Sequence, residues 1–348
     1  MRTRQLRSQH QAVPVSALCL GVMALGVHQG EDSSYAVLDR YFEAGGRFLD
    51  TANNYGAWTE ESLGTQAGDS ERLLGRWIAS RGVAEEVVVA TKCGAGKADP
   101  RRPLSGQAPT NYEGLAPEVV RRELTASLER LGLPRVGVYY GHVDDRTRQA
   151  AEIADTFADL VEEGLVQVPG LSNTTTWRLA EARAHSRSAS RPAFGAWQQE
   201  HSLYWPAPGG AEDTLVTREG LDYAAEHPDL TILSYSPLQK GQLARPWLPL
   251  PDRYAHPGSG RRLLTAHQIA HAHGSTVNQV VLAWHLAGPA SSVRYAAGSA
   301  TLTTDALPLR RAAMIPVIGA RTVEQLDEAL GALDVQLDAE DLAALDGC

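Results

Sequence analysis

Short apolar runs alternate with segments of helical periodicity along most of the chain. Most of these runs are apolar at successive positions, which is typical of parallel strands covered on both faces. The pattern predicts eight strands, at residues 15–20, 47–49, 87–90, 136–140, 166–168, 194–197, 231–234 and 315–318.

The segments between these runs repeat apolar residues every three to four positions, as helices with one buried face do. Leu124, Leu128 and Leu131, for example, form a stripe behind Pro117, a residue favoured in the first turn of a helix. We expect helices around residues 69–78, 117–131, 153–164, 263–273, 277–286 and 322–333.

Eight strands interleaved with helices predict either an open doubly wound sheet or a closed (β/α)8 TIM barrel. An open dinucleotide-binding sheet would carry G-x-G-x-x-G after its first strand, but the segment from Gly21 to Gly26 lacks that spacing. We therefore expect an α/β barrel of one domain, residues 1–348, with long loops at 94–114 and 239–260 at its C-terminal face. Such barrels run to ~250 residues or more.

The N-terminal region has two interpretations. Arg2, Arg4 and Arg7 precede an apolar stretch at residues 15–27, a length within the ~7–15 residues of a signal-peptide core. The stretch is too short for a membrane-spanning helix of ~20 residues. Glycines interrupt it and no small-residue cleavage site follows, so we favour a buried strand.

Composition narrows the class of protein. The chain has 32 Lys and Arg against 41 Asp and Glu, a net charge of −9, which argues against nucleic acid or an anionic membrane as the main partner. Cys19, Cys93 and Cys348 form no C-x-x-C pair, so we expect neither a disulfide framework nor a metal site. A reducing, cytoplasmic location fits this cysteine usage.

Chemically active side chains follow successive strands. Asp50 and Tyr55 come after the second run, Lys92 after the third and His142 after the fourth. In a barrel these strand ends meet at one rim, where active sites form. Each residue alone has an ordinary structural explanation, such as a helix cap, a solvated charge or ring packing. Their conjunction at consecutive strand ends favours a catalytic site.

Several motifs resemble the aldo-keto reductase superfamily. Residues 48–56, Phe-Leu-Asp-Thr-Ala-Asn-Asn-Tyr-Gly, are similar to its D-T-A-x-x-Y-G signature. Further blocks follow in the family's order, at residues 15–21, 89–92, 139–142, 170–173, 234–238 and 337–342. The resemblance covers nearly the whole chain and implies the same barrel fold.

The resemblance implies reduction of an aldehyde or ketone by hydride from NADPH, without metal or flavin. Hydride addition builds negative charge on the carbonyl oxygen, which needs a positioned donor and then a proton. By resemblance Tyr55 is the proton donor, Lys92 and Asp50 are its electrostatic partners, and His142 is a second donor. A free tyrosine titrates near ~10, and the Lys92 ammonium is expected to lower that pKa.

The resemblance also implies a set of cofactor-binding residues. Ser172, Asn173 and Gln198 are expected to hydrogen-bond the nicotinamide carboxamide, and Tyr235 is expected to stack on its ring. Ser236 and Leu238 are also expected to bind the cofactor. Those for the adenosine end are Gly319, Arg321, Gln325 and Glu328, with Arg321 expected at the 2′-phosphate. Val317 and Ala329 depart from the residues common there, which leaves NADH open beside NADPH.

Trp58, Val143 and Trp205 are expected to line the substrate pocket. We expect the substrate to be a small-molecule carbonyl compound, and sugars and secondary metabolites are among the candidates. Two alternatives remain at this stage: an NAD(P)+-dependent sugar or alcohol dehydrogenase, because the reaction is reversible, and a non-catalytic subunit that senses nicotinamide for a partner protein. Ordinary packing and a surface position remain alternatives for Tyr235 and Arg321.

Overall fold

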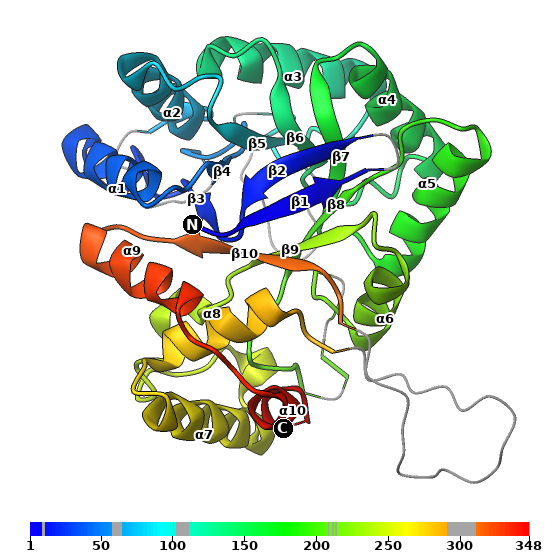
Figure 1. Ribbon diagram of the computed structural model, residues 1–348. Helices are drawn as coiled ribbons and strands as arrows, with labels where there is room; N and C mark the ends of the chain where they lie inside the picture. Colours follow the sequence, from blue (N-terminus) through cyan, green and yellow to red (C-terminus); the bar gives the residue numbers. More distant parts are fainter. Residues whose placement is uncertain are drawn as a thin grey trace, which may run out of the picture.

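The computed structural model describes residues 1–8, 11–57, 65–99, 101, 111–207, 209–210, 212, 214–290 and 311–347. Eight parallel strands close into a barrel in the order β10-β3-β4-β5-β6-β7-β8-β9, with helices around it (Figure 1). They are β3 (Cys19–Gly21), β4 (Phe48–Asp50), β5 (Val88–Cys93), β6 (Val136–Gly141), β7 (Val166–Ser172), β8 (Ala196–Glu200), β9 (Thr231–Tyr235) and β10 (Met314–Gly319). The predicted (β/α)8 class is confirmed, and each predicted run contributes to a barrel strand.

The helices follow the predicted periodicity. Helix α3, for instance, starts at Pro117, buries Leu124 and Leu131, and ends where Gly132 adopts φ +66°. The α-helices are α1 (Glu31–Glu43), α2 (Asp69–Arg81), α3 (Pro117–Leu131), α4 (Ala150–Glu162), α5 (Thr176–Ser188), α6 (Arg218–Glu226), α7 (Pro257–Ala272), α8 (Val277–Ala287), α9 (Val323–Leu330) and α10 (Ala339–Gly347). Short 3₁₀ turns are η1 (Gln239–Gly241), η2 (Asp252–Tyr254) and η3 (Gly331–Leu333).

An antiparallel hairpin precedes the barrel. The prediction of one continuous strand at residues 15–20 was therefore wrong. The strands of the hairpin are β1 (Thr3–Arg7) and β2 (Ala12–Ser16), so the predicted run is split between β2 and β3. Leu6, Val13 and Val15 join the apolar core inside the barrel. The carbonyl of Arg7 lies against Gly195, just before β8 begins, so the hairpin closes the N-terminal end of the barrel. The apolar stretch therefore supplies both a plug and a wall strand.

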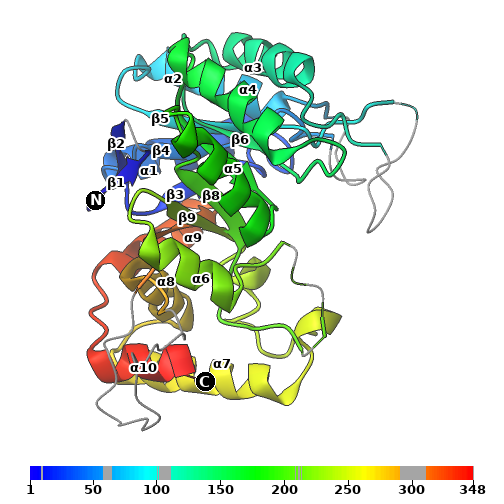
Figure 2. The same cartoon turned by 90° about the vertical axis from the view of Figure 1, so that its right-hand side faces the viewer.

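A second, smaller apolar core lies beside the barrel and is built mainly by the chain between β9 and β10 together with α10. Side chains of α7, α8 and α10 pack together with Leu203 and Tyr254. Figure 2 shows α7 and α10 lying together on the side of the barrel away from α2 and α3. The predicted loop at 239–260 thus contains η1, η2 and the start of α7, whereas part of the predicted loop at 94–114 lies outside the described residues.

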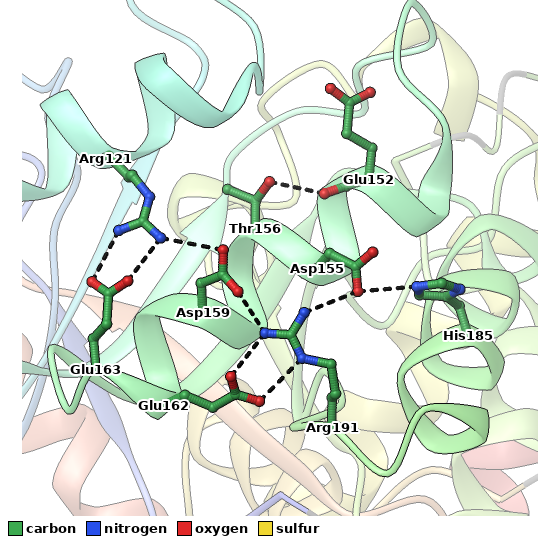
Figure 3. Close-up of polar contacts among 9 residues, drawn as sticks. All are labelled: Arg121, Glu152, Asp155, Thr156, Asp159, Glu162, Glu163, His185 and Arg191. Atoms are coloured by element: carbon green, nitrogen blue, oxygen red, sulfur yellow. Dashed lines mark hydrogen bonds and ion pairs between the residues drawn. The ribbon is translucent and has the colours of Figure 1, made fainter.

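An ion-pair network fixes α4 between its neighbours on the surface (Figure 3). Arg191 contacts Asp159 at 2.5 Å and Glu162 at 2.9 Å, and Arg121 contacts Glu163 at 2.8 Å. Asp155 joins Arg191 to His185 on α5. Most of these side chains are well exposed, so salt screens the network and its contribution to stability is small. It links α3, α4 and the end of α5, which lie beside β6 and β7, whose ends carry site residues.

No helix in the described ranges has both the length and the apolarity needed to cross a lipid bilayer.

Two buried histidines sit behind the barrel wall. His201 follows β8 and His285 lies on α8, with ring centroids 5.2 Å apart. The His285 Nδ1 atom and the Ser234 hydroxyl are 2.8 Å apart. Burial, followed by the charge of Arg262, lowers the pKa of His201 to about 3. Burial, followed by His201, lowers the pKa of His285 well below its ordinary value. Both imidazoles are therefore neutral in the folded protein near neutral pH.

This pair makes the fold sensitive to acid. Below about pH 6.5 the unfolded chain protonates both histidines while the folded protein does not. The free energy of unfolding therefore decreases as the pH is lowered, by up to about 1.4 kcal/mol per pH unit for each histidine. Denaturant unfolding from pH 7 to 5 measures this slope. We expect His285→Asn to reduce the slope relative to the wild-type protein. An unchanged slope in His285→Asn would contradict the assignment.

Candidate active site

The four predicted catalytic side chains come together at the C-terminal rim of the barrel. Asp50 is the last residue of β4, Lys92 lies near the end of the adjacent β5, and His142 directly follows β6. Tyr55 stands in the turn after β4, which is closed by a hydrogen bond from its own N–H to the Ala52 carbonyl. Strand order alone places three of the four side by side.

Lys92 links the acid to the phenol. Its ammonium donates to Asp50 Oδ1 at 2.5 Å, to the Thr51 carbonyl at 2.7 Å and to the Tyr55 hydroxyl at 3.4 Å. The Lys92 side chain is 0% exposed and that of Asp50 3%, so this ion pair is fully desolvated. A buried ammonium is tolerable here because a carboxylate and further oxygens surround it. Asp50, Lys92 and Tyr55 thus form one connected unit, which we call the relay.

The pKa of Tyr55 lies above its ordinary value, contrary to the expectation from the ammonium alone. Burial is the largest influence and raises it; Lys92 acts in the predicted, lowering direction but does not outweigh burial. Burial alone lowers the pKa of Lys92, while Asp50 and Tyr55 raise it by more in total. In the protein as it stands, therefore, the phenol holds its proton and the amine holds its charge.

His142 lies beside the phenol as a neutral imidazole. Its ring meets that of Tyr55 edge to face, with centroids 5.8 Å apart. Burial, helped by the Lys92 charge, lowers the pKa of His142 well below its ordinary value. Its backbone N–H donates to the Cys93 carbonyl at 2.8 Å, which ties the end of β6 to β5. A neutral imidazole next to the phenol is a suitable second hydrogen-bond donor.

The residues predicted for the nicotinamide lie on the opposite part of the rim. Ser172 ends β7, Gln198 lies in β8 and Tyr235 ends β9. Asn173 adopts φ +52°, and its amide donates to the His142 carbonyl at 2.9 Å and to Ser172 Oγ at 3.2 Å. The Tyr235 hydroxyl donates to Asn173 Oδ1 at 2.7 Å. These side chains are brought together, and Asn173 joins them to the backbone of His142.

The turn after β9 is held by a buried acid that the sequence analysis did not single out. Ser236 adopts φ +54° and Leu238, half-buried, precedes η1. Glu200, the last residue of β8, accepts hydrogen bonds from Gln239 at 3.1 Å and from the Tyr254 hydroxyl at 2.8 Å. The Arg253 guanidinium contacts it as well. Glu200 thereby anchors the turn predicted to contact the cofactor. The one sequence signal for this anchoring role was the position of Glu200 at a strand end, two residues after Gln198.

The predicted adenosine-end residues lie at the end of β10 and along α9. Gly319 and Arg321 are exposed at the end of β10. The Arg321 N–H donates to Gln325 Oε1 at 2.9 Å, so Gln325 supports the turn. Glu328 is tied to α8, because its Oε1 accepts from Asn278 at 3.2 Å. Arg321 thus projects at the same end of the barrel as the relay, where its strand ends.

The predicted substrate residues have different surroundings. Val143 is half-buried directly after His142, and Trp58 lies outside the described residues. Trp205 packs edge to face on His201 at 5.8 Å and beneath Arg218 at 5.0 Å, so its ring is engaged by the protein. Met23, in the loop after β3, is 46% exposed and was not selected in the sequence analysis.

Comparison with known proteins identifies the family. The model of the Aldo/keto reductase family matches residues 17–348, and the chain belongs to this family. It is similar to an uncharacterized oxidoreductase, YrpG, of Bacillus subtilis (30% identity, 95% of this chain, 91% of the relative). It is also similar to a norsolorinic acid reductase of Aspergillus flavus (27%, 98% and 80%) and to the aldo-keto reductase ausK of Emericella nidulans (26%, 98% and 80%). The family and these relatives support an oxidoreductase.

Proposed function

We propose that the protein reduces an aldehyde or ketone to the alcohol with NADPH, and that Tyr55 supplies the proton. The observation that carries this proposal is the Lys92 ammonium, which contacts Asp50 at 2.5 Å and the Tyr55 hydroxyl at 3.4 Å at the barrel mouth. A solvated lysine would need neither burial nor two such partners. Relatives named norsolorinic acid reductases support a carbonyl compound as substrate, with sugars and secondary metabolites among the candidates.

The residues present fit a nicotinamide. Amide and hydroxyl groups of Ser172, Asn173 and Gln198 lie at neighbouring strand ends, and such groups complement a carboxamide. Tyr235 is half-buried beside them, which leaves part of its ring available for stacking. When bound there, the reduced nicotinamide supplies the hydride.

The side chains of the relay handle charge and proton. The Tyr55 hydroxyl and the neutral His142 donate hydrogen bonds to the substrate oxygen, and so stabilise the negative charge that develops on it. Tyr55 then gives up its proton, and Lys92 stabilises the resulting phenolate at short range. Asp50 keeps Lys92 charged and oriented. Burial of the whole set strengthens each of these interactions.

Arg321 is assigned to the 2′-phosphate, which predicts a cofactor-specific effect. We expect Arg321→Ala to raise KM for NADPH by about tenfold, because a charge-assisted contact to phosphate is worth about 1.5–3 kcal/mol when made in full. KM for NADH, which lacks this phosphate, should not change. Initial rates with both cofactors measure the ratio. Equal losses with both cofactors would place Arg321 outside the phosphate site.

A carbonyl panel tests the proposed function. Purified protein with NADPH is offered aldehydes, ketones and sugar carbonyls, and cofactor absorbance is followed, with Tyr55→Phe as the matched control. Turnover by the wild type alone supports the proposal. Cofactor binding without turnover across the panel supports the sensing subunit instead. Efficient turnover only of alcohols with NAD(P)+ would identify a dehydrogenase.

We further propose that residues 1–348 act as one domain and that the protein works in a reducing, cytoplasmic compartment. The buried free thiols of Cys19 and Cys93 support this location, because neither takes part in a disulfide.

A further inference from the structure

One hydrogen bond crosses the mouth of the barrel. The Gln198 amide donates to Asp50 Oδ2 at 2.8 Å, although the two residues are 148 positions apart. Their strands, β8 and β4, stand four places apart in a closed ring of eight, so they face each other across the barrel. Gln198 is 3% exposed and Asp50 is 2% exposed. The bond therefore joins the side of the rim assigned to the cofactor with the side that holds the relay.

Each oxygen of Asp50 has its own donor. Lys92 occupies Oδ1 and Gln198 occupies Oδ2, so the carboxylate is fixed in rotation from both sides. The same bond fixes Gln198, because a side-chain amide is planar and one oriented N–H sets the direction of the second N–H and of the carbonyl. The second N–H and the carbonyl of Gln198 are thus held in a defined direction without any bound ligand, and the buried Tyr140 hydroxyl is a further polar neighbour of this amide.

We propose that Gln198 is a positioning residue that couples the carboxamide site to the relay: Asp50 orients the Gln198 amide for the cofactor, and Gln198 orients Asp50 for Lys92 and Tyr55. This inference rests on the proposed function, because it assigns the edge of Gln198 that does not face Asp50 to a nicotinamide carboxamide. Coupling of this kind is reciprocal, so a change at Asp50 must alter cofactor affinity through Gln198.

Asp50→Asn gives a sharp test because it keeps the shape of the side chain and removes one acceptor. Lys92 Nζ and Gln198 Nε2 then compete for a single oxygen, and the charged ammonium forms the stronger bond. The new NH2 group faces the Gln198 N–H donor, so the Gln198 amide must turn over. It would then present its carbonyl where it now presents a donor, and the wrong edge would face the carboxamide.

The experiment is a double-mutant cycle on NADPH affinity, measured by calorimetry. The four proteins are the wild type, Asp50→Asn, Gln198→Met and the double variant; NADPH is used because its nicotinamide ring is uncharged and is not directly affected by the lost charge. We expect each single variant to bind about tenfold more weakly, which corresponds to loss of one buried hydrogen bond. The double variant should bind no more weakly than Gln198→Met.

Ser172→Ala provides the matched control. Ser172 is assigned to the same carboxamide but has no contact with Asp50 among its hydrogen bonds in the described residues. Its effect should therefore multiply with that of Asp50→Asn. Multiplicative effects in the Gln198 cycle would overturn the inference while leaving the proposed function intact. Failure of the wild type to bind NADPH would instead overturn the proposed function.

A second measurement needs no change at Asp50. In Gln198→Met the carboxylate loses a hydrogen-bond donor, and its negative field at Tyr55 becomes stronger, which raises the pKa of the phenol. The high-pH limb of the reductase pH profile should move upward by about half a unit or more, whereas Ser172→Ala should leave it in place. A profile that stays fixed in Gln198→Met would show that Gln198 does not act on the relay.

Discussion

Tyr55→Phe is expected to lower kcat by about 10²- to 10⁴-fold, the usual range for loss of a positioned proton donor. The ring and its edge-to-face contact with His142 remain, so only the hydroxyl next to Lys92 is removed. The substrate oxygen then loses one hydrogen bond and its source of a proton. Steady-state rates with the best carbonyl of the panel measure this loss.

Cofactor affinity is the control for that variant. Tyr55 Oη contacts Lys92, and none of its hydrogen bonds in the described residues goes to Ser172, Asn173 or Gln198. The NADPH dissociation constant of Tyr55→Phe should therefore remain within about twofold of the wild-type value. Full turnover in this variant would remove Tyr55 from the reaction. Loss of NADPH binding would mean that the substitution had disturbed the cofactor site.

Lys92→Met is expected to abolish turnover and also to destabilise the fold. It leaves the Asp50 carboxylate buried beside an apolar side chain, and breaking a buried ion pair in this way costs about 3–5 kcal/mol. The phenolate of Tyr55 would also lose the ammonium that stabilises it. Denaturant unfolding and kcat, measured on the same preparation, separate the two effects.

The double variant Asp50→Leu with Lys92→Met tests the cause of the instability. With both charges replaced by apolar groups, most of the lost unfolding free energy should return, since such replacements of a buried pair are often neutral. Activity should not return, because the relay is absent. A double variant as unstable as Lys92→Met would point to lost packing of the lysine stem rather than to an unpaired charge.

The regular part of the fold could be predicted because its signals are local. The apolar stripe of α3 and the runs of β6 and β7 each lie within a few consecutive residues. The hairpin was missed because β1, Thr-Arg-Gln-Leu-Arg, buries only Leu6 and reads as polar by itself. The hairpin covers the N-terminal end of the barrel, and this surface exists only once the eight strands have closed into a ring.

The site shows the same division between local and long-range signals. Strand ends placed Asp50, Lys92 and His142 together, since neighbouring strands fix neighbouring side chains. The bond from Gln198 to Asp50 could not be predicted, because it depends on which strands face each other across the closed ring. The predicted direction of the Tyr55 pKa shift was also wrong. Burial of the phenol raises its pKa, and burial depends on the folded surroundings of the ring rather than on nearby sequence.

Transfer of a label from the cofactor to the alcohol is the most direct test of hydride transfer with Tyr55 as proton donor. NADPH carrying deuterium at the hydride position is incubated in ordinary water with a carbonyl substrate, and the alcohol is examined by NMR. We expect deuterium on the carbinol carbon with the wild-type protein and almost no labelled product with Tyr55→Phe. Alcohol formed without the label, or labelled equally well by both proteins, would contradict this expectation.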